Sequence, residues 1–205
     1  MHTPAGWWVV PATHAIWIPP QVEHSVRSHG PFRGWSAYVA QANCSELPLS
    51  PRTLHVSGLL RELVHRAKNF GDTPSLAQQR LTQVLIDEIA ALPEEPLGLP
   101  RPNDIRLNRL VDAMLGDLAD TRSVEAWAEV AGVSPRTLAR RFLAETGLTL
   151  TAWRQRARTL RAIELLAAGG SVTTVALDLG YDTVSGFIAM FSRVMGVTPG
   201  QYGRE

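Results

Sequence analysis

The sequence contains very few cysteines, very few lysines and no long hydrophobic run. Cys44 is the only cysteine among 205 residues, so the chain can form neither an internal disulfide nor a Cys-rich zinc site. No apolar segment approaches the roughly 20 residues of a membrane span, and the opening MHTPAGWWVV lacks the basic start and apolar core of a secretory signal. We therefore expect a reduced, cytoplasmic protein with no membrane-spanning part.

The sequence also lacks the patterns that accompany catalysis. It has no Gly-rich phosphate loop, no nucleophile elbow and no paired-carboxylate arrangement. We therefore expect no enzyme, no cofactor and no metal site. With 45% hydrophobic and 19% charged residues, the composition is that of a globular protein, and the length allows one large or two small domains.

Positive charge is scarce in total but concentrated in one stretch. The formal net charge of +1 would by itself argue against a nucleic-acid partner. Residues 134–161, however, carry seven arginines against the single acid Glu145, a net charge of +6. Nineteen of the twenty basic residues are arginine, whose planar guanidinium suits bidentate contact with phosphate or guanine. A high-GC genome produces the same bias, and this alternative stays open.

A proline-rich segment, PEEPLGLPRP, divides the chain, and we interpret residues 93–102 as a linker that no helix or central strand can cross. Before it, the β-rich runs WWVV, AIWI, SVRS and WSAYV predict short antiparallel strands between about 7 and 40. Apolar residues at helical spacing then predict helices at about 58–70 and 75–92. Residues 1–92 therefore form one predicted region and residues 103–205 another.

The region after the linker has a purely helical pattern. Ser123, Ser134 and Ser171 stand where N-caps are needed, and Pro135 occupies a first helical position. Glycines in the left-handed conformation are expected to end most helices, at Gly116, Gly132, Gly147, Gly169 and Gly196. The expected helices span about 104–115, 123–131, 135–146, 150–168, 172–179 and 184–195, followed by a short turn near Tyr202.

An internal repeat covers most of this region. SVEAWAEVAGVS (123–134) aligns with SVTTVALDLGYD (171–182), and the helices that follow align with one extra residue in the second turn. The aligned pairs include Ser123 with Ser171, Ala128 with Ala176, Gly132 with Gly180, Leu138 with Phe187, and Phe142 with Phe191. Small Ala128 and Ala176 allow close helix packing, and Val133 and Tyr181 fill the space after each glycine. Two copies of helix, glycine turn and helix indicate two helix-turn-helix units.

In a helix-turn-helix unit the second helix enters the DNA major groove and offers its N-terminal residues to base edges. On residues 135–146 the expected buried stripe is Leu138, Phe142 and Leu143, so the arginines project elsewhere. Arg140 is the best candidate to read guanine O6 and N7. The candidate DNA contacts of the first unit are Ser134, Arg136, Thr137, Arg140 and Arg141. A solvated face of an ordinary helical domain would also leave arginines exposed, but the repeat favours DNA binding.

The second unit has weaker base-reading residues. Thr183, Ser185 and Arg193 are expected to contact phosphates, and Ile188 or Ala189 a thymine methyl, so this half positions more than it specifies. A connecting helix at 150–168 buries an apolar stripe and carries Arg154 and Arg158 as further candidate DNA contacts. Its length is expected to hold the two reading helices about one DNA turn apart, roughly 34 Å.

Three segments of this region resemble the AraC/XylS family of bacterial regulators: FSRVMGVTPGQY, VSPRTLARRFLAETGLT and ALDLGYDTVSGFIAMF. The resemblance spans about residues 102–203. It implies a mainly α fold with a C-terminal all-α domain, in which two helix-turn-helix units are joined by a long helix. It also implies double-stranded DNA and RNA polymerase as partners. The second reading helix departs from the family pattern in its weak polar equipment.

The N-terminal region resembles a sensing domain only in part. PATHAIWIPPQVEHSV is similar to the second half of a cupin barrel, with His24 at the histidine position. The earlier barrel strands would lie before Met1, so the segment is a truncated form, a late start, or a remnant that pairs with another copy. Trp8, Trp17 and His24 are candidate contacts for a small-molecule effector, although tryptophans in a short β segment more often belong to the core. His24 has no metal-ligating partner nearby.

Several alternatives stay open. The apolar helices at 58–70 and 75–92 either form a homodimer or pack on the strands of their own subunit. A cupin-type metal-dependent enzyme with an accessory DNA-binding tail requires ligands that this sequence lacks. A ligand-sensing protein that binds another regulator would make Arg136 and Arg140 incidental.

Overall fold

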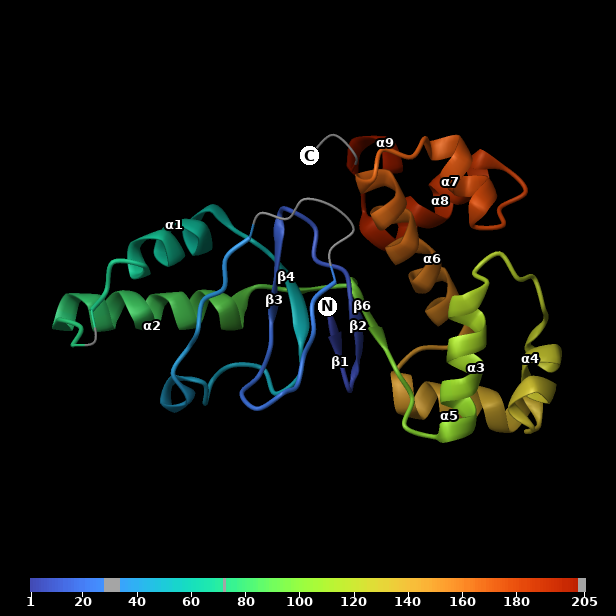
Figure 1. The fold of residues 1–205 in the computed structure, drawn as a ribbon, viewed down its shortest axis with the longest axis horizontal. Coiled ribbons are helices and arrows are strands. Elements are labelled where there is room, and N and C mark those ends of the chain that lie inside the picture. Colours follow the sequence, from blue (N-terminus) through green and yellow to red (C-terminus); the bar gives the residue numbers. More distant parts are fainter. Residues whose placement is uncertain (28–33, 72, 203–205) are drawn as a thin grey trace. The chain divides into compact units, whose positions relative to one another are not determined.

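The computed structural model describes residues 1–27, 34–71 and 73–202, and its fold is mainly helical with small sheets, as expected (Figure 1). The chain forms two compact units. The first runs from Val10 to Glu95 and includes Met1, whereas the second combines His2–Val9 with the chain from Pro96 onwards.

The first unit contains a small antiparallel sheet and two helices. The strands β3 (His14–Trp17), β4 (Arg52–His55) and β5 (Glu94–Glu95) pair in that order, and a short 3-10 helix spans Gln41–Asn43. The helices α1 (Gly58–Ala67) and α2 (Leu76–Ala91) begin at Ser57 and Ser75, whose hydroxyls accept backbone N–H bonds. A small core holds them together, formed by Val56, Leu60, Leu63, Val64 and Leu85 with Ala15 packed against it. The apolar stripes of both helices are therefore largely used inside the subunit.

The predicted strand at WSAYV is wrong. Residues 34–40 form no strand or helix, and Trp35 and Tyr38 are 45% and 95% exposed. A run of β-prone residues makes a strand only where a partner strand and a covering layer exist. SVRS contributes a single bridge at Ser25, and its last residue, Ser28, lies outside the described residues. The partner of β3 is instead β4, which the sequence analysis missed because four residues carry too little pattern.

The second unit carries the helices that the sequence indicated, with boundaries within one residue of those expected. They are α3 (Ile105–Gly116), α4 (Val124–Ala131), α5 (Pro135–Thr146), α6 (Leu150–Ala167), α7 (Val172–Asp178), α8 (Val184–Met195) and α9 (Pro199–Tyr202). Four of the five glycines expected to end helices have positive φ, namely Gly132, Gly147, Gly169 and Gly196. The prediction that Gly116 ends a helix in the left-handed conformation is wrong. Gly116 is the last helical residue of α3, and Asp117 follows in an extended conformation.

The core of the second unit surrounds α6. Trp153, Leu160 and Ile163 of this helix are buried, and α6 contacts α5, α7 and α8. Phe142 of α5 packs edge to face on Trp153, with ring centroids 5.9 Å apart. Each fully buried large apolar side chain of this kind contributes about 1.5–3 kcal/mol. Leu143 was expected in this core, but its side chain is 47% exposed.

A three-stranded sheet belongs to the helical unit. The strands β1 (His2–Thr3), β2 (Gly6–Trp8) and β6 (Gly98–Pro100) pair in that order. Leu97 and Leu99 are buried in the core around α6, and the Trp153 indole N–H donates to the Pro100 carbonyl at 2.8 Å. The compact unit is therefore larger than residues 103–205. Strands do form in the proline-rich linker, and both β5 and β6 are edge strands, where proline is tolerated.

Candidate nucleic-acid interface

The first helix-turn-helix unit consists of α4, a turn at Gly132 and α5. Ala128 is buried between the helices, and the Val133 N–H donates to its carbonyl at 3.0 Å. Ser134 caps α5 by accepting the Thr137 N–H at 3.2 Å, and the two hydroxyls are 2.8 Å apart. The polar atoms of these two side chains are thus engaged with each other at the start of the helix. Ala128 is buried, and the side chain of Val133 packs partly buried against the same core, as expected for the residue after the glycine.

One face of α5 carries unengaged guanidinium groups. Arg136 and Arg140 are exposed, and within the part of the chain that the structure describes neither has an ion pair or hydrogen bond. Ala139 and Leu143 are also exposed and share this face by helical spacing. The sequence analysis missed Leu143 because its spacing from Leu138 and Phe142 suits a buried stripe as well.

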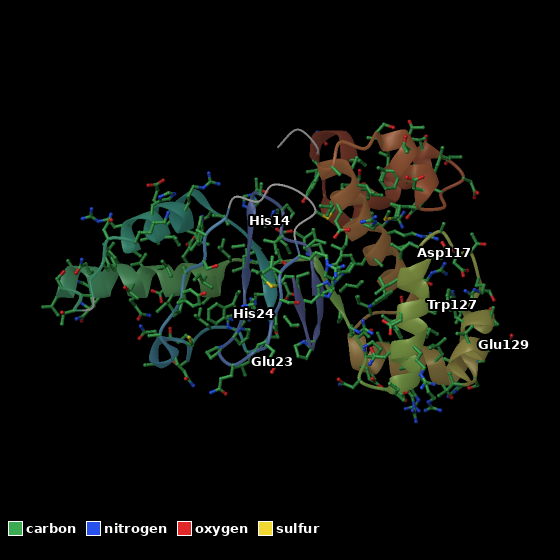
Figure 2. The ribbon with its side chains drawn as sticks, viewed as in Figure 1. His14, Glu23, His24, Asp117, Trp127 and Glu129 are labelled. Atoms are coloured by element: carbon green, nitrogen blue, oxygen red, sulfur yellow. The ribbon has the colours of Figure 1, made fainter. Side chains whose placement is uncertain are left out.

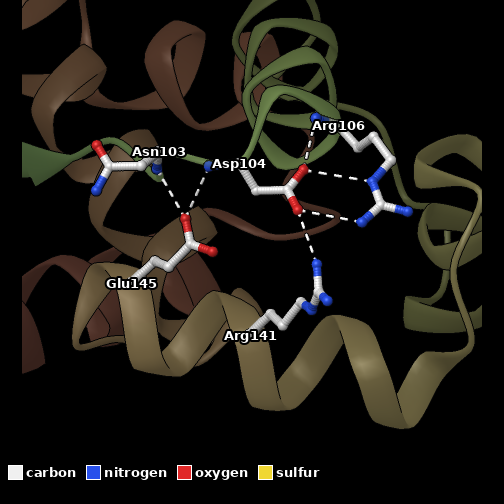
Figure 3. A network of polar contacts seen from close by, with 5 residues as sticks. All are labelled: Asn103, Asp104, Arg106, Arg141 and Glu145. Carbon is white, nitrogen blue, oxygen red and sulfur yellow. Dashed lines mark hydrogen bonds and ion pairs between the residues drawn. The ribbon is translucent and has the colours of Figure 1, made fainter.

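The other flank of α5 is tied to the start of α3 (Figure 3). Arg141 forms an ion pair with Asp104 at 2.9 Å, and a carboxylate oxygen of Glu145 accepts the backbone N–H groups of Asn103 and Asp104 at 2.7 and 2.9 Å. Asp104 caps α3, and its carboxylate accepts hydrogen bonds from Arg106. These bonds lower the pKa of the Asp104 carboxyl to about 2. The guanidinium of Arg141 is therefore engaged within the protein, unlike those of Arg136 and Arg140.

The second helix-turn-helix unit consists of α7, a turn at Gly180 and α8. The Thr183 hydroxyl caps α8 by accepting the Gly186 N–H at 3.1 Å. Ser185, Ala189 and Arg193 are exposed, whereas Ile188 is half-buried against the core. Tyr181 packs on Phe187 with ring centroids 5.5 Å apart, as expected for the residue after the glycine. The exposed face of α8 is thus short and nearly uncharged, with Arg193 in its last turn.

Two arginines of α6, Arg154 and Arg158, are engaged with backbone carbonyls. Arg154 donates to the carbonyls of Asp120 and Arg122, and burial lowers its pKa. Arg158 donates to the carbonyls of Leu118 and Asp120 at 2.7 and 3.2 Å. The sequence analysis interpreted both residues as DNA contacts, but it could not detect these bonds because their partners lie more than thirty residues away.

The candidate effector residues are not gathered in one unit. Trp8 is buried in the second compact unit, which contains all the helices from α3 onwards. A Cβ built on Gly98 would lie 2.5 Å from its indole nitrogen. Trp17 belongs to the first compact unit, and its indole N–H donates to the Pro48 carbonyl at 2.8 Å. His24 is exposed in the same unit, with its Nδ1 3.0 Å from the Val22 carbonyl (Figure 2).

Within residues 1–27, 34–71 and 73–202, no three His, Cys, Asp or Glu side chains are placed to hold a metal ion. The described helices include none with the length and apolar character needed to cross a membrane.

Comparisons with known proteins agree with this architecture. A family model described as a helix-turn-helix domain matches residues 127–205. The HTH-type transcriptional regulator NimR of Escherichia coli K12 is 34% identical over 197 residues, which cover 95% of this chain and 72% of NimR. RipA, an HTH-type transcriptional regulator of Corynebacterium glutamicum, is 32% identical over 73% of this chain and 46% of its own length.

Among solved structures, the C-terminal domain of AraT, a response regulator from Geobacillus stearothermophilus, is 29% identical, covers 49% of this chain and 85% of that chain, and has a TM-score of 0.47. The identity to NimR extends over 95% of this chain, and the family model covers the repeat from Trp127 onwards. With two helix-turn-helix units on one connecting helix, this chain belongs to the AraC/XylS family of bacterial DNA-binding transcriptional regulators.

Proposed function

We propose that this regulator reads two adjacent segments of the major groove, with α5 specifying the sequence and α8 mainly positioning the protein. The observation that carries the proposal is the unengaged face of α5. Arg136 and Arg140 have no partner among the described residues, while the flank with Arg141 and Glu145 is tied to α3. A helix fixed on one side and cationic on the other is suited to the major groove.

The chemistry of α5 supports base reading by Arg140. A guanidinium in the middle of a groove-facing helix matches the O6 and N7 acceptors of guanine. Arg136 lies in the first turn, where the free backbone N–H groups also attract phosphate. Ser134 and Thr137 engage each other, so in this proposal they contact the DNA backbone rather than bases.

The chemistry of α8 supports a positioning role. Thr183, Ser185 and Arg193 offer hydroxyls and one charge to phosphates. Ala189 is exposed and is the better candidate for a thymine methyl, because Ile188 is already half-buried in the core. For Arg154 and Arg158, a phosphate contact competes with the carbonyl bonds that already use their donors.

We further propose that the protein works in the cytoplasm, where a bacterial regulator meets its DNA, and that it acts through RNA polymerase as its relatives' title of transcriptional regulator suggests. We also propose that the first compact unit, Val10–Glu95, binds a small-molecule effector and forms a homodimer. The apolar residues of α1 and α2 left for a dimer are few: Leu59, Leu76 and Val84. The names of the relatives favour regulation over the cupin-type enzyme alternative.

Binding to DNA at graded salt tests this proposal. The preferred duplex is first selected by the wild-type chain from a random-sequence library. We expect affinity for this duplex to fall steeply with salt, and Arg140→Ala to lose about 1–3 kcal/mol on it while losing little on random DNA. Arg109→Ala, which removes an exposed arginine of α3, is the matched control and should change neither. An equal loss on both DNAs would assign Arg140 to the phosphate backbone.

A further inference from the structure

The loop between α3 and α4 touches the turn of the second helix-turn-helix unit. A Cβ built on Gly180 would lie 2.7 Å from both the Cα and the carbonyl oxygen of Ala119. No real Cβ contact is that short, so glycine is required here by the neighbouring backbone as well as by its φ of +74°. The loop that leads into the first unit is therefore in direct contact with the second.

Arg158 of the connecting helix joins the same two elements. Its guanidinium donates to the carbonyls of Leu118 and Asp120 in the loop at 2.7 and 3.2 Å. The same guanidinium lies 5.3 Å from the ring centroid of Tyr181, the residue after Gly180. Hydrogen bonds from a charged donor and a cation–π contact are stronger where solvent is partly excluded.

The loop also contacts α4 of the first helix-turn-helix unit. Asp120 and Arg122 form an ion pair at 2.5 Å, and the Arg122 guanidinium lies 4.0 Å from the ring centroid of Trp127, which is fully buried in α4. Asp117, at the start of the loop, accepts the Ala119 N–H at 3.0 Å (Figure 2 labels Asp117 and Trp127). Several backbone carbonyls of the loop and the side chains of Asp117, Asp120 and Arg122 are therefore engaged.

We propose that residues 117–122, Arg158 and Gly180 form a brace that sets the spacing and orientation of α5 relative to α8. A connection through α6 alone would leave each unit free to tilt at its end of the helix. A second contact between the units removes that freedom before any ligand binds, which is pre-organisation. Arg158 is a positioning residue in this arrangement. Only the benefit for reading DNA rests on the proposed function.

The internal repeat supplies a matched control. Gly132 is the counterpart of Gly180 in the first unit and also has positive φ, +64°, but a Cβ built on Gly132 meets nothing within 4 Å. Alanine at either position therefore carries backbone strain, whereas only Gly180→Ala also pushes the two units apart. In the same way, Arg161→Met removes an arginine of α6 that pairs locally with Glu164, whereas Arg158→Met removes the bonds to the loop.

Distances between spin labels test the brace without DNA. The full chain carries Cys44→Ser together with Ala139→Cys on α5 and Ala189→Cys on α8, two exposed positions for the labels. Pulsed electron–electron double resonance then gives the distribution of distances between the two labels, and circular dichroism checks that each variant is folded.

We expect a narrow distribution for the parent, for Gly132→Ala and for Arg161→Met. Gly180→Ala and Arg158→Met should broaden the distribution or shift its mean. If Gly180→Ala does not fold, Arg158→Met decides, because it keeps the aliphatic stem in place. A broad distribution in the parent, or a parent-like distribution in folded Arg158→Met, would overturn the brace. Neither result depends on whether the chain reads DNA as proposed.

Discussion

The two helix-turn-helix units share one scaffold but differ in what surrounds their turns and helices. The first has a charged reading helix and a turn at Gly132 with open space around it. The second has a nearly uncharged reading helix, and its turn at Gly180 is pressed against Ala119. Under the proposed function, this contrast divides a duplicated framework between two tasks, base reading by the first copy and placement by the second.

The framework itself should be equally important in both copies, and this expectation has the largest effect. Phe142 and Phe191 occupy matching positions, and both are fully buried. Phe142→Ala and Phe191→Ala should each cost about 3–5 kcal/mol in the free energy of unfolding, because each leaves a cavity beside an aromatic neighbour. Urea unfolding followed by circular dichroism measures both. A loss much smaller for one of them would show that its unit has the looser core.

The division of tasks predicts different effects of arginine removal on DNA binding. Arg193→Ala in α8 should weaken binding of all sequences alike and reduce the slope of log affinity against log salt by about one, as loss of one phosphate contact does. Arg140→Ala in α5 should instead lose affinity for the selected duplex alone. Titrations of both duplexes at several salt concentrations separate the two patterns. Sequence-dependent loss in Arg193→Ala would make α8 a second specifying helix.

The smallest expected effect concerns acid. Asp104 pairs with Arg141 and so ties α5 to α3, and the hydrogen bonds from Arg106 lower the pKa of its carboxyl from the ordinary value of 3.8 to about 2. A lowered carboxyl pKa gives stability that is present above about 4 and lost as the pH falls towards 2. Thermal unfolding across this range should show a smaller loss for Asp104→Asn than for the wild type. An identical acid dependence would mean that Asp104 contributes nothing through its charge.

Much of the helical unit was accessible from the sequence because its signals are local. A serine or threonine cap bonds an N–H only three residues away, as Ser123, Ser134 and Ser171 do. The glycine turns and the repeat of apolar positions act over similarly short distances. The face of α5 that carries Arg136 and Arg140 followed from the same periodicity.

The sequence analysis could not detect contacts whose partners lie far along the chain. The guanidinium groups of Arg141, Arg154 and Arg158 bond Asp104 and carbonyls of the loop before α4, while their role as DNA contacts stays a prediction. The strand at WSAYV was wrong for a related reason, because β propensity forms no strand without a partner.

Local signals in the sequence specify where the helices of the second compact unit begin and end and most of their apolar faces, because caps and helical periodicity involve neighbours within one or two turns. Only contacts in the folded chain show which arginines lack a partner within the described residues, how His2–Val9 joins the helical unit, and why a Cβ at Gly180 would collide with Ala119. Those outcomes depend on contacts between segments tens of residues apart, and no local pattern encodes such a pairing.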